Sequence, residues 1–208
     1  MINEKIYKLG NGVEVRLYPE WLRNAREKFA QAEKLSWSNE IVTMFQKQSC
    51  IERRTVNYGL AYTYSKTAKA SIDWEPLALE LKQNLDSAFG IDWQQCACNE
   101  YGTTSAYISP HHDKDTIIDG EKREPIVIAS ISLGGQRTMV LTPPGANLKG
   151  VPITVSGLKK VPGSVAIDLP SGSMVLFSNS FNRFWKHSIP KDYKDVAGKR
   201  ISLTYRHF

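Results

Sequence analysis

The sequence has 208 residues, of which 41% are hydrophobic, so it is long enough for one sizeable domain with a packed core. Its net charge of +6 suits nucleic acid or another polyanion as a partner. No apolar N-terminal region and no long apolar window is present, so we expect neither a signal peptide nor a membrane span. The three cysteines form no C-x-x-C pattern, which argues against a disulfide framework and favours an intracellular, reducing compartment (cytoplasm or nucleus).

Residues 1–40 are predicted to form a structural extension. Alternation of Val13, Val15 and Leu17 fits a strand or hairpin around Gly10–Gly12. Pro19 then opens a helical pattern whose apolar face is formed by Leu22, Ala25, Phe29 and Ala32. Nothing in this segment indicates chemistry.

Residues 41–65 contain two runs with the composition of strands, IVTMFQKQ and CIERRTVNYGLAYTYS. Basic and aromatic side chains are interleaved in them. One interpretation is a hairpin with a solvated basic face. The other is a nucleic-acid clamp, with cations such as Arg53 and Arg54 on phosphates and aromatic rings stacked on bases. Composition does not choose between the two.

The second half of the chain is predicted to be mainly β. A helix opens at Asp73 and Pro76, carries leucines at helical spacing and ends at Gly90. Short strands separated by glycine and proline then follow at 93–99, 105–109, 126–133, 137–142, 151–155, 164–168, 173–177 and 201–206. Helices followed by many short strands indicate an α+β, mainly β fold, a sandwich or jelly roll with helical support. The Gly/Pro-rich section 142–163 is predicted to be a surface loop.

The stretch Asn99–Asp115 contains the pair His111-x-Asp113, whose side chains share a face if the segment is extended. One histidine and one carboxylate are two thirds of a two-His-one-carboxylate triad, which suits Fe(II) and oxygen chemistry. His187 is a better third ligand than His207, which is the penultimate residue and less certain to be ordered. A zinc hydrolase with the same three ligands is the competing interpretation.

Arg200 and Arg206 are six residues apart on the last predicted strand and therefore share a face. If that face is buried, the two guanidinium groups need anionic partners, because an unpaired buried charge is costly. A dicarboxylate cosubstrate would supply them, since arginine binds carboxylates in a bidentate manner. Pairing with carboxylates of the protein, or an outward orientation, is the alternative. A zinc hydrolase needs no such arginine pair.

Taken together, these motifs resemble the AlkB family of Fe(II)/2-oxoglutarate dioxygenases. The resemblance rests on Asn99-x-Tyr101, on His111-x-Asp113 followed by Lys114 and Asp115, on His187 and on the R-x-S-L-T-Y-R end, and it runs from about residue 41 to the last residue. The segment RRTVNYGLAYTYS looks like the substrate lid of the members that repair double-stranded DNA, and MFQK looks like their intercalating finger.

The resemblance implies one dioxygenase domain, 1–208, with a double-stranded β-helix (jelly roll) core at 93–208. Residues 41–70 would form a nucleotide-recognition lid and 1–40 an N-terminal extension. His111, Asp113 and His187 would hold Fe(II). The cosubstrate 2-oxoglutarate would be bound by Asn99, Tyr101, Arg200, Ser202, Thr204 and Arg206. Ser202 departs from the asparagine usual in the family, and a hydroxyl offers fewer hydrogen bonds than an amide.

The substrate residues follow from the same resemblance. Tyr64 would stack on a flipped-out base, with the His111 ring on the other face, and Tyr62 would add a polar contact. Asp115 would recognise an exocyclic amine, and Phe45 would fill the gap that the extruded base leaves.

The implied function is oxidative dealkylation of bases such as 1-methyladenine and 3-methylcytosine in DNA, with O2 as oxidant and formaldehyde and succinate as by-products. The same oxygenase chemistry on RNA or on a protein side chain is one alternative, and a non-catalytic nucleic-acid-binding domain is another. We expect a monomer without a membrane partner.

Overall fold

The structure is a computed structural model of the whole chain. It describes residues 3–44, 47–64, 67–69, 71–113, 116–118, 120–193 and 198–208, and within 40–51 and 62–70 it describes only the backbone.

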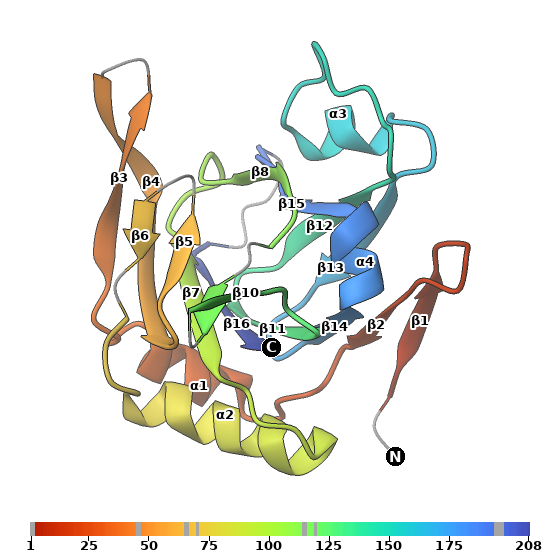
Figure 1. Cartoon of the computed structure of the whole chain (residues 1–208). Helices are drawn as coiled ribbons and strands as arrows, with labels where there is room; N and C mark the ends of the chain where they lie inside the picture. The colour runs from red at the N-terminus through yellow and green to blue at the C-terminus, as the bar shows by residue number, and fades with distance from the viewer. Residues whose placement is uncertain are drawn as a thin grey trace.

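Two antiparallel sheets form the body of the molecule (Figure 1). The larger sheet contains, from edge to edge, β1 (Lys5–Lys8), β2 (Glu14–Tyr18), β14 (Met174–Ser178), β11 (Val127–Gly134), β16 (Arg200–His207), β7 (Gln95–Tyr101), β4 (Lys47–Gly59) and β3 (Ser38–Met44). The smaller sheet contains β13 (Val165–Leu169), β12 (Arg137–Thr142), β15 (Lys186–Ile189) and β8 (Ile108–His111). Two short hairpins complete the described strands: β5 (Tyr62–Tyr64) with β6 (Thr67–Lys69), and β9 (Thr116–Ile118) with β10 (Glu121–Arg123).

The side chains of the larger sheet divide between two cores because successive residues of a strand point to opposite faces. On β16, Ile201, Leu203 and Tyr205 are buried in the core that also contains the leucines of the long helix. The opposite face packs towards the smaller sheet, where Met139 and Ile167 share a second core with Val175. The polar residues of β16 therefore face the space between the two sheets.

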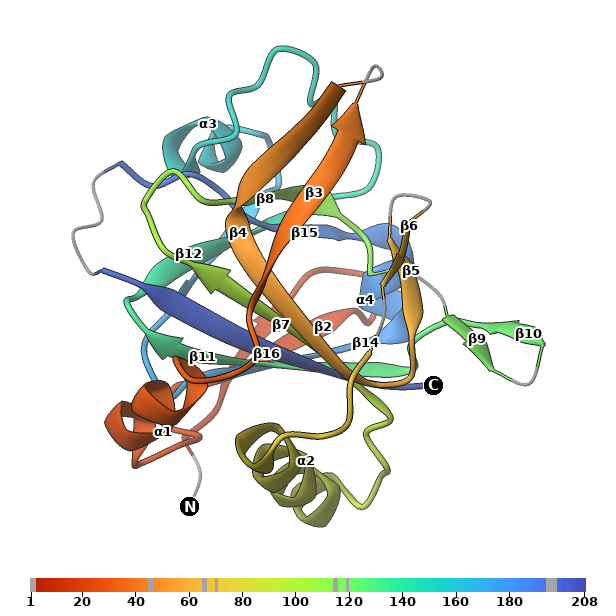
Figure 2. The ribbon, with the colours of Figure 1, turned by 90° about the vertical axis from the view of Figure 1, so that its left-hand side faces the viewer.

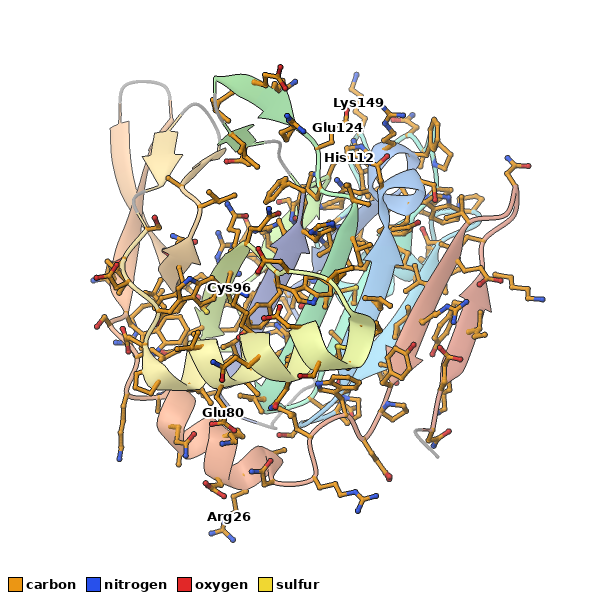
Figure 3. All side chains as sticks on the ribbon, turned by 60° about the horizontal axis from the view of Figure 1, so that its bottom comes forward. Arg26, Glu80, Cys96, His112, Glu124 and Lys149 are labelled. Carbon is orange, nitrogen blue, oxygen red and sulfur yellow. The ribbon has the colours of Figure 1, made fainter. Side chains whose placement is uncertain are left out.

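Two helices cover the outer face of the larger sheet. They are α1 (Ala25–Ala32) and α2 (Pro76–Phe89), and α2 lies across the strands (Figures 2 and 3). Pro76 occupies the first turn of α2, and Gly90 ends the helix in a left-handed conformation with φ of 66°. Lys28 of α1 is buried and pairs with Glu80 of α2 at 2.7 Å, so an ion pair joins the two helices.

The structure confirms the predicted mainly-β architecture and the hairpin around Gly10–Gly12. It also shows that this hairpin extends the larger sheet, since β2 pairs with β14. The strand predicted at 151–155 is wrong. The Thr154 hydroxyl instead accepts a hydrogen bond from the Gly157 amide and caps a short helix, α3 (Val155–Lys159), within the section predicted to be a loop.

Two further differences concern the start of a helix and a strand that the sequence did not predict. The first helix begins at Ala25 rather than near Pro19, and β15, which carries His187, was not predicted. The remaining described helix is α4 (Asn179–Phe184), immediately before β15. No helix in the described ranges has both the length and the apolar content that crossing a bilayer requires.

Packing of α2 against the sheet gives a direct test of the fold. Leu81 is fully buried, whereas Leu79 on the same helix is 37% exposed. We expect Leu81→Ala to lower the free energy of unfolding by about 2–5 kcal/mol, since it leaves a cavity. Leu79→Ala, the matched control, should change it by less than about 1 kcal/mol, because much of that side chain already contacts water. Urea unfolding of both variants measures the difference; equal losses would contradict the packing described here.

Candidate metal centre and anion pocket

Three side chains with metal-ligand chemistry meet between the two sheets. His111 at the end of β8 and His187 on β15 are register partners on neighbouring strands, and their ring centres are 4.3 Å apart. Asp113, two residues after His111, places Oδ1 3.5 Å from Nε2 of each histidine. One ligand atom from each residue lies within 4.8 Å of the others. The predicted triad is therefore assembled by strand pairing.

The protonation states of the triad suit a cation. Nδ1 of His111 donates to the Ser109 carbonyl at 2.8 Å, which fixes the ring so that Nε2 is the nitrogen that faces Asp113. Burial lowers the pKa of His187 below its ordinary value, and the neighbouring His111 imidazole lowers it further. His187 is therefore neutral at pH 7, as metal binding requires.

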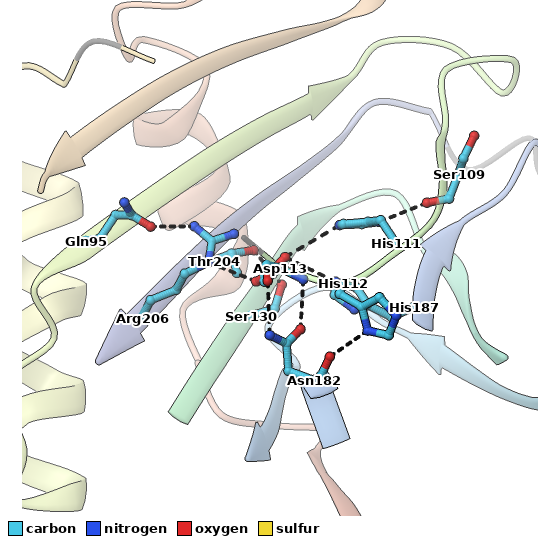
Figure 4. A network of polar contacts seen from close by, with 10 residues as sticks. All are labelled: Gln95, Ser109, His111, His112, Asp113, Ser130, Asn182, His187, Thr204 and Arg206. Atoms are coloured by element: carbon cyan, nitrogen blue, oxygen red, sulfur yellow. Dashed lines mark hydrogen bonds and ion pairs between the residues drawn. The ribbon is translucent and has the colours of Figure 1, made fainter. Parts of the chain in front are cut away.

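Asp113 stays ionised although it is buried. Burial alone would raise the pKa of its carboxyl, but Arg206 and the two histidines outweigh that effect and hold the pKa well below its usual range. Arg206 donates Nε to Asp113 Oδ2 at 2.8 Å, and its Nη1 donates to Gln95 at 2.8 Å (Figure 4). Asn182 of α4 fixes the Asp113 backbone by accepting from its amide at 2.7 Å and donating to its carbonyl at 3.1 Å.

A second cation, Arg200, lines the same cavity. Arg200 is 1% exposed, and its guanidinium lies 5.1 Å from the centre of the Tyr101 ring. Nη2 donates to Ser132 at 2.9 Å, whereas Nε and Nη1 make no hydrogen bond to any residue that the structure describes. Burial lowers the pKa of Arg200 to about 10, so the group remains charged at pH 7. Unused buried donors on a cation fit an incoming carboxylate.

The structure brings all predicted metal and cosubstrate residues to one cavity. Its lining includes His111, Asp113 and His187 together with Asn99, Tyr101, Arg200, Ser202, Thr204 and Arg206. Ser202 is the register partner of Asn99 on β7, and the Thr204 hydroxyl hydrogen-bonds with that of Ser130 at 3.0 Å. The two arginines thus have different surroundings: Arg206 is paired with Asp113, whereas Nε and Nη1 of Arg200 have no partner among the described residues.

The predicted substrate residues are placed only in part. Arg53 lines the cavity and donates Nη1 to the Tyr107 carbonyl at 3.0 Å. Arg54 points to the other face of β4 and pairs with Glu100 at 2.6 Å, so we leave it out of the substrate residues proposed below. Phe45 and Asp115 lie outside the described residues. For Tyr62 and Tyr64 the structure describes only the backbone of β5.

Three residues that support the site were not found by sequence analysis. They are Gln95, Asn182 and His112, whose Nδ1 donates to the Asn182 carbonyl at 2.6 Å. None of them belongs to a spacing pattern that indicates a role, because their partners come from segments that are distant in sequence. His112 is next to His111 in the sequence, but its contact with Asn182 depends on the fold and is not indicated by that adjacency.

Replacement of Arg206 should show how much an unpaired, buried Asp113 carboxylate lowers the free energy of unfolding. We expect Arg206→Met to lower the free energy of unfolding of the metal-free protein by about 3–5 kcal/mol at pH 7, because it leaves Asp113 charged and without its cation. In the wild type the depressed pKa of Asp113 stabilises the fold above its unfolded value of about 4, and this stabilisation is lost as the pH falls. The difference between the proteins should therefore shrink towards about pH 3.

Urea unfolding of both proteins across this range measures the effect, with Arg16→Met, on the exposed side of β2, as a control. A difference that stays constant with pH would show that the loss comes from packing and not from the carboxylate.

The comparison with known proteins agrees with this geometry. The family model described as the 2OG-Fe(II) oxygenase superfamily matches residues 11–206. The human protein named alpha-ketoglutarate-dependent dioxygenase alkB homolog 3 is 30% identical over 156 residues, which cover 74% of this chain and 51% of that protein. Human DNA oxidative demethylase ALKBH2 is 26% identical over 168 residues, 79% of this chain and 60% of that protein. The chain thus spans little more than half the length of these curated relatives.

Similarity in structure extends over the whole chain. The solved structure titled OsALKBH1 superposes with a TM-score of 0.61 at 15% identity and covers 98% of this chain and 100% of that one, which supports the jelly-roll fold. The family implies Fe(II), 2-oxoglutarate and O2, and the His-Asp-His donor set and the open donors of Arg200 fit a metal and a carboxylate ligand. The chain therefore belongs to the 2OG-Fe(II) oxygenase superfamily, and within it the chain is AlkB-like.

Proposed function

We propose that this protein is an Fe(II)/2-oxoglutarate-dependent dioxygenase that removes N-alkyl groups from nucleobases in DNA, with 1-methyladenine and 3-methylcytosine as the lesion type. The observation that carries the proposal is the meeting of His111, Asp113 and His187 with Arg200 in one cavity. The similarity to ALKBH2, which is named as a DNA oxidative demethylase, and the net charge of +6 favour DNA as the substrate.

We assign the following roles to the site residues. His111, Asp113 and His187 would hold Fe(II), which together with 2-oxoglutarate and O2 supplies the oxidising power when bound. Arg206 keeps Asp113 ionised and oriented, and Asn182 holds its backbone. Arg200 would bind the carboxylate of 2-oxoglutarate that is remote from the metal. The polar neighbours that would complete the cosubstrate site are Asn99, Tyr101, Ser202, Thr204 and Arg206.

The substrate end of the cavity remains a prediction. His111 and Arg53 both line the cavity, and the His111 ring would contact an extruded base. Tyr62, Tyr64, Asp115 and Phe45 keep the roles implied by the family resemblance. A single domain with a lid at 41–70, a monomeric state and an intracellular, reducing location also remain predictions.

RNA is the principal alternative substrate, because the metal and cosubstrate residues would be the same and only the lid would differ. An enzyme that acts on a protein side chain would also have the same metal and cosubstrate residues. A non-catalytic nucleic-acid-binding domain is disfavoured by the intact triad, whose ionised carboxylate has its own buried cation.

The first experiment combines the protein anaerobically with Fe(II) and 2-oxoglutarate, then adds oxygen and an oligonucleotide carrying 3-methylcytosine, with mass spectrometry as the readout. We expect loss of the methyl mass that depends on iron and on 2-oxoglutarate. The double variant His111→Ala/Asp113→Ala should abolish it while retaining the circular dichroism of the wild type. Unchanged turnover by that variant would sink the proposal, and parallel methylated DNA and RNA strands would identify the preferred substrate.

Arg200 provides a separate test of the cosubstrate assignment. Arg200→Met should raise the KM for 2-oxoglutarate by roughly 10-fold or more, because it removes charge-assisted hydrogen bonds to a carboxylate. The same change should not destabilise the ligand-free protein, since it removes a buried cation that lacks a carboxylate partner among the described residues. Steady-state kinetics and urea unfolding measure the two effects, with Arg16→Met as the control. An unaltered KM would assign 2-oxoglutarate to other residues.

A further inference from the structure

A second hollow lies next to the metal cavity, on the side of α4. It is a groove of about 200 Å³, lined by residues of α4, of the start of β15, and of the end of β12 with the loop that follows it. His112 lines both this groove and the metal cavity, and Lys186 in the groove immediately precedes the ligand His187. The two hollows therefore share a wall at His112.

The groove has the chemistry of an anion site. Lys186 and Arg183 line it, and none of its lining residues is acidic. Lys186 is half-buried, and its ammonium makes no hydrogen bond or ion pair with any residue in the described part of the chain. A half-buried cation without a protein partner is only partly hydrated, so an arriving anion regains favourable interactions at a low cost.

Arg183 forms an ion pair with an acidic neighbour outside the groove. Its Nε donates to Glu124 Oε2 at 2.8 Å, and Glu124 also accepts from the Asn179 amide at 3.1 Å. Both charged side chains are largely exposed, so the pair is weak and its guanidinium can exchange partners. Glu124 therefore competes with any anion that Arg183 meets in the groove.

An aromatic side chain is also exposed at the groove. Phe184, the last residue of α4, is 59% exposed, whereas Phe181 of the same helix is fully buried. On the opposite wall lie Pro143 and Pro144. A solvent-facing phenyl ring beside cations provides a stacking surface next to a phosphate site, which is how proteins hold single-stranded nucleic acid.

We propose that this groove binds the nucleotide adjacent to the reacting base, with its phosphodiester on Lys186 and Arg183 and its base stacked on Phe184. The inference rests on the proposed function, because the strand must continue beyond the metal cavity once a base has entered it. The bound nucleotide would be the one next to the reacting base, because His112 lines both the metal cavity and the groove. An acidic peptide would use the cations but has no need of the exposed ring.

The test is binding of a fluorescent, unmodified single-stranded DNA, measured by anisotropy as a function of salt, which requires no turnover. Lys186→Met should weaken binding roughly 3-fold and reduce the slope of log affinity against log salt by about 0.7, the value for one phosphate contact on a single strand. Phe184→Ala should weaken binding by roughly 5-fold or more without changing that slope, because stacking releases no counterion.

Glu124→Gln provides a variant that is expected to strengthen DNA binding rather than weaken it. It keeps an acceptor for Asn179 but frees Arg183, so we expect binding to strengthen by roughly 2-fold at low salt, a result that misfolding cannot produce. Lys34→Met, after α1 and outside the groove, is the matched control and should leave the affinity unchanged. Unchanged affinity in the Lys186 and Phe184 variants would overturn the proposal, as would a wild-type protein that does not bind the strand.

Turnover separates this proposal from the function on which it rests. The wild type should favour a methylated oligonucleotide with several flanking nucleotides over a methylated mononucleotide, and Lys186→Met and Phe184→Ala should reduce that preference. If the wild type binds the strand through the groove but demethylates nothing, the proposed reaction fails and the groove stands. If it demethylates both substrates equally well, the groove fails and the reaction stands.

Discussion

The buried ion pair between Asp113 and Arg206 is the interaction on which the site depends. It joins the turn after β8 to the last strand of the larger sheet and keeps a carboxylate charged in a place where burial alone would neutralise it. Loss of either partner would leave a buried charge without its counter-ion, which costs far more than the pair itself contributes. The metal centre is therefore prepared before a metal binds.

The opposite situation holds at Arg200. Its guanidinium is buried beside Tyr101 and Ser132 and keeps hydrogen-bond donors unused in the described structure. Burial that lowers its pKa to about 10 is a cost to the empty protein, and an anion in the cavity would remove that cost. The two arginines thus have different partners although they lie on the same face of one strand: Arg206 pairs with Asp113, and Arg200 keeps donors that no described residue uses.

Helix α4 connects the metal centre to the surface. Asn182 points inward and fixes the Asp113 backbone, whereas Arg183 and Phe184 are exposed on the outer side. Asn182, Arg183 and Phe184 are consecutive residues, so these contacts lie within a single helical turn. A strand seated on its outer side would contact the same element that positions the carboxylate ligand.

The sequence by itself determined the parts whose signals are local. The H-x-D pair, the even spacing of the two arginines, and the proline and glycine that bound α2 are each set by neighbouring residues, and the structure confirms their geometry. Where two local signals compete, the prediction failed: residues 151–155 have the composition of a strand, but the Thr154 cap starts a helix.

Only the tertiary structure decided which distant residues meet. The pairing of β15 with β8 places His187 beside His111, and the fold gives Arg206 to Asp113, Asn182 to its backbone and Arg54 to Glu100. These contacts join segments separated by tens of residues along the chain, and their energies depend on burial, which no local pattern contains.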